Sequence, residues 1–226
     1  MHAEIIRHAP RTPSKPNRTG HESPADRIAT LFNPRDAVRS VCPGSTVFLH
    51  GDRVESLYQI VSGTVACCSI SPDGRRQIFC FARAGDVLGL TELDHWHFTA
   101  TAVDHVILRP APRERAWAQI HADSALQNAV QITAARDIAA REQHMFTLAY
   151  LPAEERLRLF LEDFASTRKS RGFVVLPMTR QDIGDHLGLT LETVSRAFSS
   201  LRRKGLIEMH GCDRFRVLAD PIAQAA

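Results

Sequence analysis

Apolar residues between positions 46 and 109 come in short runs, and glycine or proline separates most of these runs. Short apolar or alternating runs with turn residues between them are typical of β-strands. Because the runs follow one another at a spacing of roughly 8–12 residues, we expect a small β-sandwich or barrel. The expected strands are residues 46–50, 57–61, 64–71, 76–81, 99–103 and 105–109.

The pattern becomes helical after Pro110 and Pro112. Residues 123–149 contain neither glycine nor proline, and small or apolar side chains recur in them with a 4,3 spacing. This spacing indicates a weak coiled-coil seam, in which alanines allow two identical helices to approach closely. We expect pairing with a second copy; the alternative is a long helix lying on the sheet of its own chain. The expected dimer contacts are Ala125, Ala129, Ile132, Arg136, Ala139 and Phe146.

Residues 179–217 carry the signals of two helices and a hairpin. Thr179 and Asp182 form a capping box, in which the Thr179 hydroxyl accepts from the Asp182 amide and the Asp182 carboxylate reaches back. Gly188 permits the sharp turn that a helix-turn-helix needs. Thr190 then caps a second helix over residues 191–204, and a hairpin of residues 206–217 forms a wing.

The second helix has an apolar stripe and a polar face. Val194, Phe198 and Leu201 recur with 4,3 spacing, so this stripe must be buried. Glu192 and Arg196 stand four residues apart near the N-terminal end, the part of a recognition helix that enters the major groove. Arginine can bind guanine with two hydrogen bonds, and glutamate can accept from the cytosine amino group. An ordinary surface salt bridge is the alternative, which the adjoining capping box, turn and wing disfavour.

Basic residues farther along suit phosphates better than bases. Between positions 190 and 216 there are six Lys or Arg residues and three acidic residues, so positive charge gathers here although the net charge of the chain is only +3. The expected phosphate contacts are Thr179, Thr190, Thr193, Ser199, Arg202, Arg203 and Lys204.

The overall composition excludes several classes of protein. Hydrophobic residues make up 44% and charged residues 23% of the chain, as in ordinary soluble globular proteins. There is neither a membrane-length apolar run nor a secretion signal, and five cysteines without a CxxC pair indicate free thiols in a reducing cytoplasm. No arrangement typical of catalysis stands out. We expect a cytoplasmic protein that is not an enzyme and has no catalytic residues, metal, cofactor or membrane partner.

Taken in order, four motifs resemble those of the CRP/FNR superfamily of bacterial transcription regulators. Residues 62–65 (Ser-Gly-Thr-Val) are similar to its strand-turn motif and residues 85–89 (Gly-Asp-Val-Leu-Gly) to its G-D-x-x-G. Residues 153–157 resemble the start of an FNR-type DNA-binding domain, and residues 188–196 resemble its recognition segment. The resemblance implies a homodimeric transcription regulator. Its implied partners are double-stranded palindromic DNA, a second copy of the chain and RNA polymerase.

The implied fold is α+β, with an N-terminal cyclic-nucleotide-binding-like β-roll (a jelly roll), a long dimerisation helix and a C-terminal winged helix-turn-helix. The expected regions are residues 25–112, 113–151 and 152–226, in that order. A proline-rich flexible arm is expected at residues 1–24, because its composition buries too little apolar surface to fold. Within these regions we expect helices at 26–38 and 153–166 and a strand at 173–176.

The recognition helix indicates a branch of the superfamily. Glu192, Ser195 and Arg196 match the E-x-x-S-R pattern of FNR-type helices, whereas CRP-type helices have arginine at the place of Leu191 and glycine at that of Ser195. The resemblance implies a palindrome like TTGAT-N4-ATCAA, with Leu191 beside a thymine methyl group. The expected base-reading residues are Leu191, Glu192, Ser195 and Arg196.

Two sensory mechanisms of the superfamily lack their residues here. Leu90 and the pair Phe98-Thr99 stand where the resemblance places the glutamate and Arg-Ser pair that bind cyclic AMP, and a buried phosphate without its arginine is costly. No cysteine precedes Cys42, and Ile107 stands at the roll position of the FNR iron–sulfur ligand. What remains resembles the FixK-like branch, which is associated with control of low-oxygen, nitrogen-fixation or denitrification genes and lacks an obvious cofactor.

A ligand-, haem- or redox-gated regulator is the alternative function. His95, His97 and His105 suit a metal or haem, but a surface loop anchored by Trp96 is the favoured interpretation.

Cysteines provide the redox form of this alternative. Of the adjacent Cys67 and Cys68, one is expected to face the core and the other to face outward, and a redox sensor would need an exposed thiol with a low pKa. Cys212 at the wing tip is the candidate redox residue, because oxidation there would place polar groups beside DNA.

Overall fold

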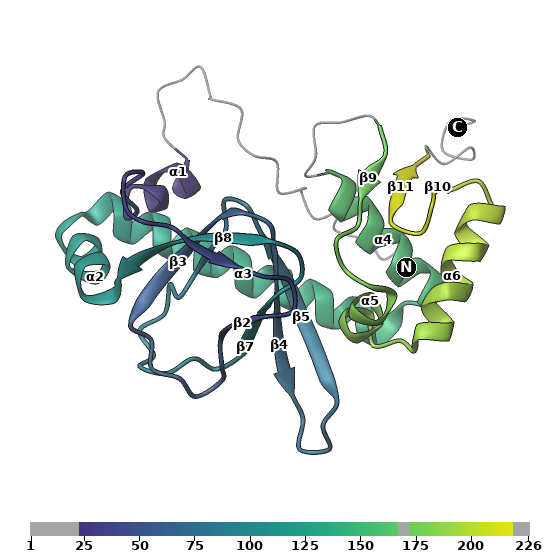
Figure 1. Ribbon diagram of the computed structural model, residues 1–226, viewed down its shortest axis with the longest axis horizontal. Coiled ribbons are helices and arrows are strands. Elements are labelled where there is room, and N and C mark those ends of the chain that lie inside the picture. Colours follow the sequence, from purple (N-terminus) through teal and green to yellow (C-terminus); the bar gives the residue numbers. More distant parts are fainter. Residues whose placement is uncertain (1–22, 167–171, 219–226) are drawn as a thin grey trace, which may run out of the picture.

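Two antiparallel sheets form a β-roll in the N-terminal half of the computed structural model, which describes residues 23–166 and 172–218 (Figure 1). The strand orders are β1-β8-β3-β6 and β2-β7-β4-β5. All six expected strands are present, and β1 and β6 are additional. Most of the arm expected at residues 1–24 lies outside the described residues. The strands are β1 (Arg39–Val41), β2 (Thr46–Phe48), β3 (Ser56–Ser62), β4 (Thr64–Ile70), β5 (Arg76–Arg83), β6 (Val87–Leu88), β7 (Thr99–Ala102) and β8 (Val106–Pro112).

Aromatic rings fill the space between the two sheets. The rings of Phe48 and Trp96 are stacked with their centroids 3.6 Å apart, and Phe98 packs edge-on against Phe48 at 5.3 Å. Trp96 is buried while His95 and His97 on either side of it are exposed, so the indole anchors this loop. Over the described ranges, no three potential metal-ligating side chains come together.

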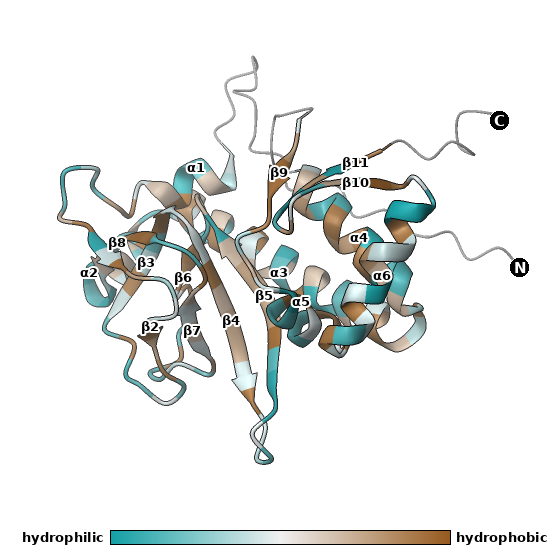
Figure 2. Ribbon diagram, turned by 45° about the vertical axis from the view of Figure 1, so that its right-hand side comes forward, coloured by the Kyte–Doolittle hydropathy of each residue, from teal (hydrophilic) through white to brown (hydrophobic). Residues whose placement is uncertain are grey.

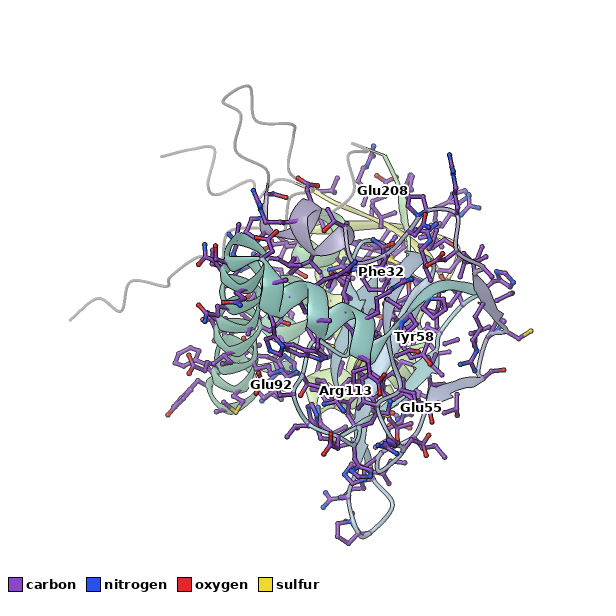
Figure 3. All side chains as sticks on the ribbon, turned by 90° about the vertical axis from the view of Figure 1, so that its left-hand side faces the viewer. Phe32, Glu55, Tyr58, Glu92, Arg113 and Glu208 are labelled. Carbon is purple, nitrogen blue, oxygen red and sulfur yellow. The ribbon has the colours of Figure 1, made fainter. Side chains whose placement is uncertain are left out.

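Three helices pack against the outside of the roll. The first, α1 (Pro24–Ala29), begins at the capping residue Ser23 and ends far short of residue 38, so the helix expected at 26–38 is wrong in its C-terminal bound. The next two, α2 (Arg113–Ala122) and α3 (Ser124–Tyr150), are separated by Asp123, whose extended backbone ends α2 and whose carboxylate caps α3. Arg113 fastens α2 to the loop after β6 by donating to the Glu92 carbonyl at 2.8 Å (Figure 3). None of the helices described is long and apolar enough to cross a membrane.

The N-terminal part of α3 packs on its own chain. Ala129 is 3% exposed and shares a cluster with Ile28 of α1, so it is not available to a second copy, in contrast to the expectation. A heptad seam drifts by about 20° per heptad around a straight α-helix, which turns the start of the seam toward the roll and its end toward solvent. The other expected dimer contacts divide into two groups. Two are half-buried, Ala125 and Ile132, and three are exposed, Arg136, Ala139 and Phe146.

The C-terminal domain combines three helices with a three-stranded sheet of order β10-β11-β9. Leu157, Leu161 and Phe215 are fully buried at its centre. The expected helix at 153–166, both helices of the helix-turn-helix and the wing hairpin are confirmed. The elements are α4 (Ala153–Ser166), β9 (Val174–Val175), α5 (Arg180–Leu187), α6 (Leu191–Arg203), β10 (Ile207–His210) and β11 (Arg214–Val217).

Strands β4 and β5 are buried on both faces. Cys67 belongs to the core of the roll, whereas Cys68 belongs with Ile78 and Phe81 to the core of the C-terminal domain. The expectation that one of the two adjacent cysteines faces outward is wrong, since they are 1% and 2% exposed. The physical reason is that α5 docks against β5 and covers the face that an isolated roll would expose to solvent.

Candidate nucleic-acid interface

A capping box and a tight turn fix α5 relative to α6. The Thr179 amide donates to the Asp182 carboxylate at 2.9 Å, and the Asp182 amide donates to the Thr179 hydroxyl at 3.1 Å. Helix α5 ends at Gly188, whose φ of 63° lies in the left-handed region that favours glycine. The Leu189 amide then donates to the Gly184 carbonyl at 2.9 Å and closes the turn. The expected capping box and turn are confirmed.

Helix α6 buries one stripe and exposes the opposite face. Val194, Phe198 and Leu201 are buried, as their spacing predicts. The helix lies at the outer edge of the molecule (Figure 1), and hydrophilic residues are frequent along it (Figure 2). The four expected base-reading residues all lie in solvent: Leu191, Glu192, Ser195 and Arg196.

Glu192 and Arg196 do not form an ion pair with each other within the described parts of the chain. The Arg196 guanidinium donates instead to the Thr193 hydroxyl at 3.3 Å. Hydrogen bonds from its own backbone amide and from the Thr190 hydroxyl hold the pKa of Glu192 below its ordinary value. At neutral pH the face therefore offers a guanidinium fork and a charged acceptor.

Arg180 connects the wing with α6 and was not among the residues predicted from the sequence. Its guanidinium lies over the Phe198 ring, 3.1 Å from the centroid, and donates to the Cys212 carbonyl at 3.4 Å. Burial lowers the pKa of Arg180 to about 10, so the side chain stays charged at neutral pH. The only sequence signal is its position directly after the capping residue. A cavity of about 170 Å³ opens here, lined by Arg180, Ser195, Phe198, Ser199, Arg202, Met209 and Gly211.

Most of the expected phosphate contacts surround this face in solvent. Arg202 and Arg203 have no ion-pair partner among residues 23–166 and 172–218, whereas the Lys204 ammonium pairs with Glu154 of α4 at 2.6 Å. Lys204 is thus partly engaged within the domain. Thr193 is half-buried, and the exposed members are Thr179, Thr190, Ser199, Arg202, Arg203 and Lys204.

Comparisons with known proteins identify the family. Residues 176–207 match the bacterial regulatory proteins of the crp family, and residues 38–123 match the cyclic nucleotide-binding domain. The nitrogen fixation regulation protein FixK of Bradyrhizobium diazoefficiens is 36% identical over 173 residues, which are 74% of this chain and 73% of that protein. FixK of Azorhizobium caulinodans is 35% identical over 82% of this chain and 75% of that protein. The chain belongs to the CRP/FNR family.

A solved structure extends this assignment to the fold. FixK2 from Bradyrhizobium japonicum matches with a TM-score of 0.79 and 31% identity, over 84% of this chain and 96% of that chain. The roll, the long helix and the winged helix-turn-helix implied by the sequence motifs are confirmed. This CRP/FNR protein is a FixK-like DNA-binding transcription regulator, and α6 lies within the residues that match the crp family.

In this CRP/FNR protein an ion-pair clamp fastens the DNA-binding domain to the roll. Arg76 of β5 forms ion pairs with Asp182 and Asp185 of α5, the second at 2.7 Å. Asp182 therefore serves both the capping box and the contact between domains. Arg76 could not be singled out from the sequence, because nothing local distinguishes it from the neighbouring Arg75.

His186 marks the point where the roll, the long helix and the DNA-binding domain meet. Its Nδ1 lies 3.0 Å from the Ile78 carbonyl oxygen of β5, and its ring stacks on His144 of α3 with centroids 4.3 Å apart. Burial, reinforced by the neighbouring His144, lowers the pKa of His186 to about 3. The ring is therefore neutral at physiological pH, which permits the stack. No sequence signal singles out these two histidines.

Proposed function

We propose that this protein is a homodimeric activator that reads a palindrome like TTGAT-N4-ATCAA in the major groove and recruits RNA polymerase. The observation that carries the proposal is the solvent-exposed face of α6 with Glu192 and Arg196 unpaired to each other. An exposed arginine can form a bidentate pair with guanine, and Leu191, which is 42% exposed, offers an apolar contact for a thymine methyl group. The names of its relatives, nitrogen fixation regulation protein FixK, support nitrogen-fixation genes as targets.

The far end of α3 supports pairing with a second copy. Four large apolar side chains stand in solvent there, and a contiguous apolar surface is a common mark of a protein interface. With Ala139 beside them, these side chains would let two helices pack along a two-fold axis, as an inverted-repeat operator requires. They are Ile138, Met145, Phe146 and Tyr150, which are 59%, 61%, 52% and 73% exposed.

The packing of the roll supports binding to DNA without cyclic AMP. Phe98, which stands where the resemblance places a phosphate-binding arginine, is 7% exposed and packs on the rings of Phe48, Phe79 and Trp96. The phosphate of a cyclic nucleotide at this place would lose solvation beside apolar rings and would lack the arginine that Phe98 replaces, which is costly. Leu90 likewise packs on the apolar cluster beneath the helices.

A gel shift tests this function directly. The purified protein without added ligand should bind a TTGAT-N4-ATCAA duplex with a Kd of about 10⁻⁸ M or tighter, at least about 10³-fold tighter than scrambled DNA. Lengthening the spacer from N4 to N9 puts the half-sites on opposite faces of the duplex, so binding should fall to that of a single half-site. Dependence on cyclic AMP, or equal binding to both spacers, would contradict the proposal. Parallel lanes with and without dithiothreitol report redox gating.

Arg203→Ala is expected to weaken binding to the palindrome and to random DNA by a similar factor. A phosphate contact carries no sequence information, and losing one per protomer should reduce the salt slope, log Kd against log salt, by about 2 for a dimer. Arg75→Ala is the matched control, because Arg75 is exposed at the tip of the β4–β5 hairpin, where it pairs with Asp73. A loss confined to the palindrome would mean that Arg203 reads bases.

A further inference from the structure

Two cysteines face each other across β4 and β5 inside the roll. Cys67 and Cys80 are directly opposite in the antiparallel register, and both side chains lie with the core of the roll. Opposite residues in an antiparallel pair have Cα atoms about 4.5 or 5.5 Å apart. Both separations lie within the range of about 4.4–6.8 Å that a disulfide spans.

A β-bulge separates this pair from the adjacent Cys68. Cys67 is opposite Cys80, but the next residue, Cys68, is opposite Ile78, so Phe79 is an extra residue in β5. Bulges redirect side chains and interrupt the hydrogen-bond ladder locally. As a result Cys67 and Cys80 face the roll, while Cys68 and Ile78 face the DNA-binding domain.

The two thiols differ in access to solvent. Cys67 is 1% exposed, whereas Cys80 is only half-buried. The hydrogen bond with Cys80, followed by burial, raises the pKa of Cys67 well above its ordinary value. Because the thiolate is the reactive form, Cys67 is a poor first nucleophile. Cys80 is therefore the thiol that an oxidant meets first, and Cys67 is positioned to resolve the product.

We propose that Cys67 and Cys80 form a reversible disulfide in response to a peroxide, and that this bond changes how the DNA-binding domain docks on β5. The Cys80 sulfur attacks one peroxide oxygen, the O–O bond breaks, and water leaves as a sulfenic acid forms on Cys80. The Cys67 sulfur then attacks the Cys80 sulfur, the S–S bond forms and the S–O bond breaks. The hydroxyl leaves as a second water, so that two thiols and one hydrogen peroxide give one disulfide and two waters. Exchange with a dithiol restores both thiols.

The docking surface lies next to this pair. The Ile78 carbonyl oxygen, two residues before Cys80, lies 3.0 Å from Nδ1 of His186. The Phe81 ring, one residue after Cys80, packs against the His186 ring with centroids 5.2 Å apart. A disulfide that changes the backbone of β5 at the bulge would therefore move both contacts that β5 makes with His186 of α5. The effect on DNA binding rests on the proposed function, whereas the disulfide itself does not.

Peptide mapping tests the disulfide. The full chain carrying Cys42→Ser and Cys212→Ser, which removes both exposed thiols, is treated with hydrogen peroxide, alkylated and digested with trypsin without reductant. Arg75 and Arg76 lie between the two cysteines, so the bond joins residues 54–75 to residues 77–83. We expect this linked peptide at the summed mass less two hydrogens, and its loss on reduction.

Single substitutions in the same background assign the bond. The linked peptide should persist in Cys68→Ala and disappear in Cys67→Ala and Cys80→Ala. Three results would overturn the proposal. They are loss of the linked peptide in Cys68→Ala alone, its absence from the parent protein (the chain carrying only Cys42→Ser and Cys212→Ser), and a sulfinic acid on Cys80 without a link. Because the mapping reads the parent protein as well, it does not depend on any one variant folding.

Hydrogen exchange and DNA binding test the coupling. Oxidation should accelerate amide exchange over residues 180–187 in the parent but not in Cys80→Ala. It should also weaken binding to the palindrome by about five-fold or more, reversibly with dithiothreitol. A mapped disulfide with unchanged exchange would overturn the coupling. Failure of the reduced protein to bind the palindrome would instead contradict the proposed function, and the exchange measurement would still decide the coupling.

Discussion

Arg196→Ala is expected to remove most of the preference for the palindrome while leaving binding to random DNA nearly unchanged. A bidentate arginine–guanine pair is worth about 1–3 kcal/mol of discrimination, and a dimer would present two of them. The combined loss is then about 2–6 kcal/mol, or roughly 30-fold to 10⁴-fold in Kd. Fluorescence anisotropy at one fixed salt concentration, with palindromic and scrambled duplexes, measures both affinities.

Arg196→Lys is the matched control for charge. Lysine keeps the positive charge but lacks the planar fork, so we expect it to lose specificity while preserving the affinity for scrambled DNA. Arg196 is exposed and its hydrogen bond to Thr193 is long at 3.3 Å, so neither variant should change the free energy of unfolding by more than about 0.5 kcal/mol. Equal loss on both duplexes would refute base reading by Arg196.

Local signals explain why the C-terminal domain could be predicted closely. Helix α4 has the expected bounds, Ala153–Ser166, because Pro152 precedes it and its apolar residues follow one stripe. The start of α5 follows from the Thr179 capping box, and its end follows from Gly188. Each signal lies within four residues of the boundary it sets. The outward face of α6 could be predicted for the same reason, since periodicity alone separates it from the buried stripe.

Contacts between distant segments could not be predicted in this way. Arg76 and Asp182 are 106 positions apart, and no local pattern of either segment indicates the other. The burial of Cys68 and Ala129 has the same origin, because each side chain would be exposed on an isolated strand or helix and is covered by another part of the fold. Alternation and heptad spacing describe one element at a time. They therefore predict which face is apolar but not which neighbour covers it.

The candidate site shows the same division. Glu192 and Arg196 are conspicuous in the sequence because they share a helical face, whereas Arg180 acts across the domain on Phe198 and the Cys212 carbonyl. Its stacking requires α5, α6 and the wing to be assembled first. The structure thus adds Arg180, which holds α6 and the wing together, to Glu192 and Arg196, the residues expected to contact bases.

Gly184→Ala is expected to be the most damaging substitution of a single small residue in the DNA-binding domain. Gly184 lies within α5, where a Cβ would meet the Leu189 carbonyl oxygen at 2.6 Å, far inside van der Waals contact. The opposing atom belongs to the backbone of the turn, so relief requires α5 and the turn to separate. That movement would break the 2.9 Å hydrogen bond from the Leu189 amide and tilt α6. We expect a cost at the upper end of the about 1–3 kcal/mol typical of overpacking, which lowers Tm by roughly 6–12 °C.

Gly205→Ala is the control that distinguishes the steric clash expected in Gly184→Ala from backbone strain alone. Gly205 lies just after α6 rather than within a helix, its φ is 70° and nothing lies within 4 Å of the added Cβ. Its cost should therefore be limited to about 1–2 kcal/mol of left-handed strain. Circular dichroism melts should place Gly184→Ala below Gly205→Ala, and gel shifts should show loss of palindrome binding only in Gly184→Ala. The reverse order of Tm values would mean that the turn between α5 and α6 can yield without moving α6.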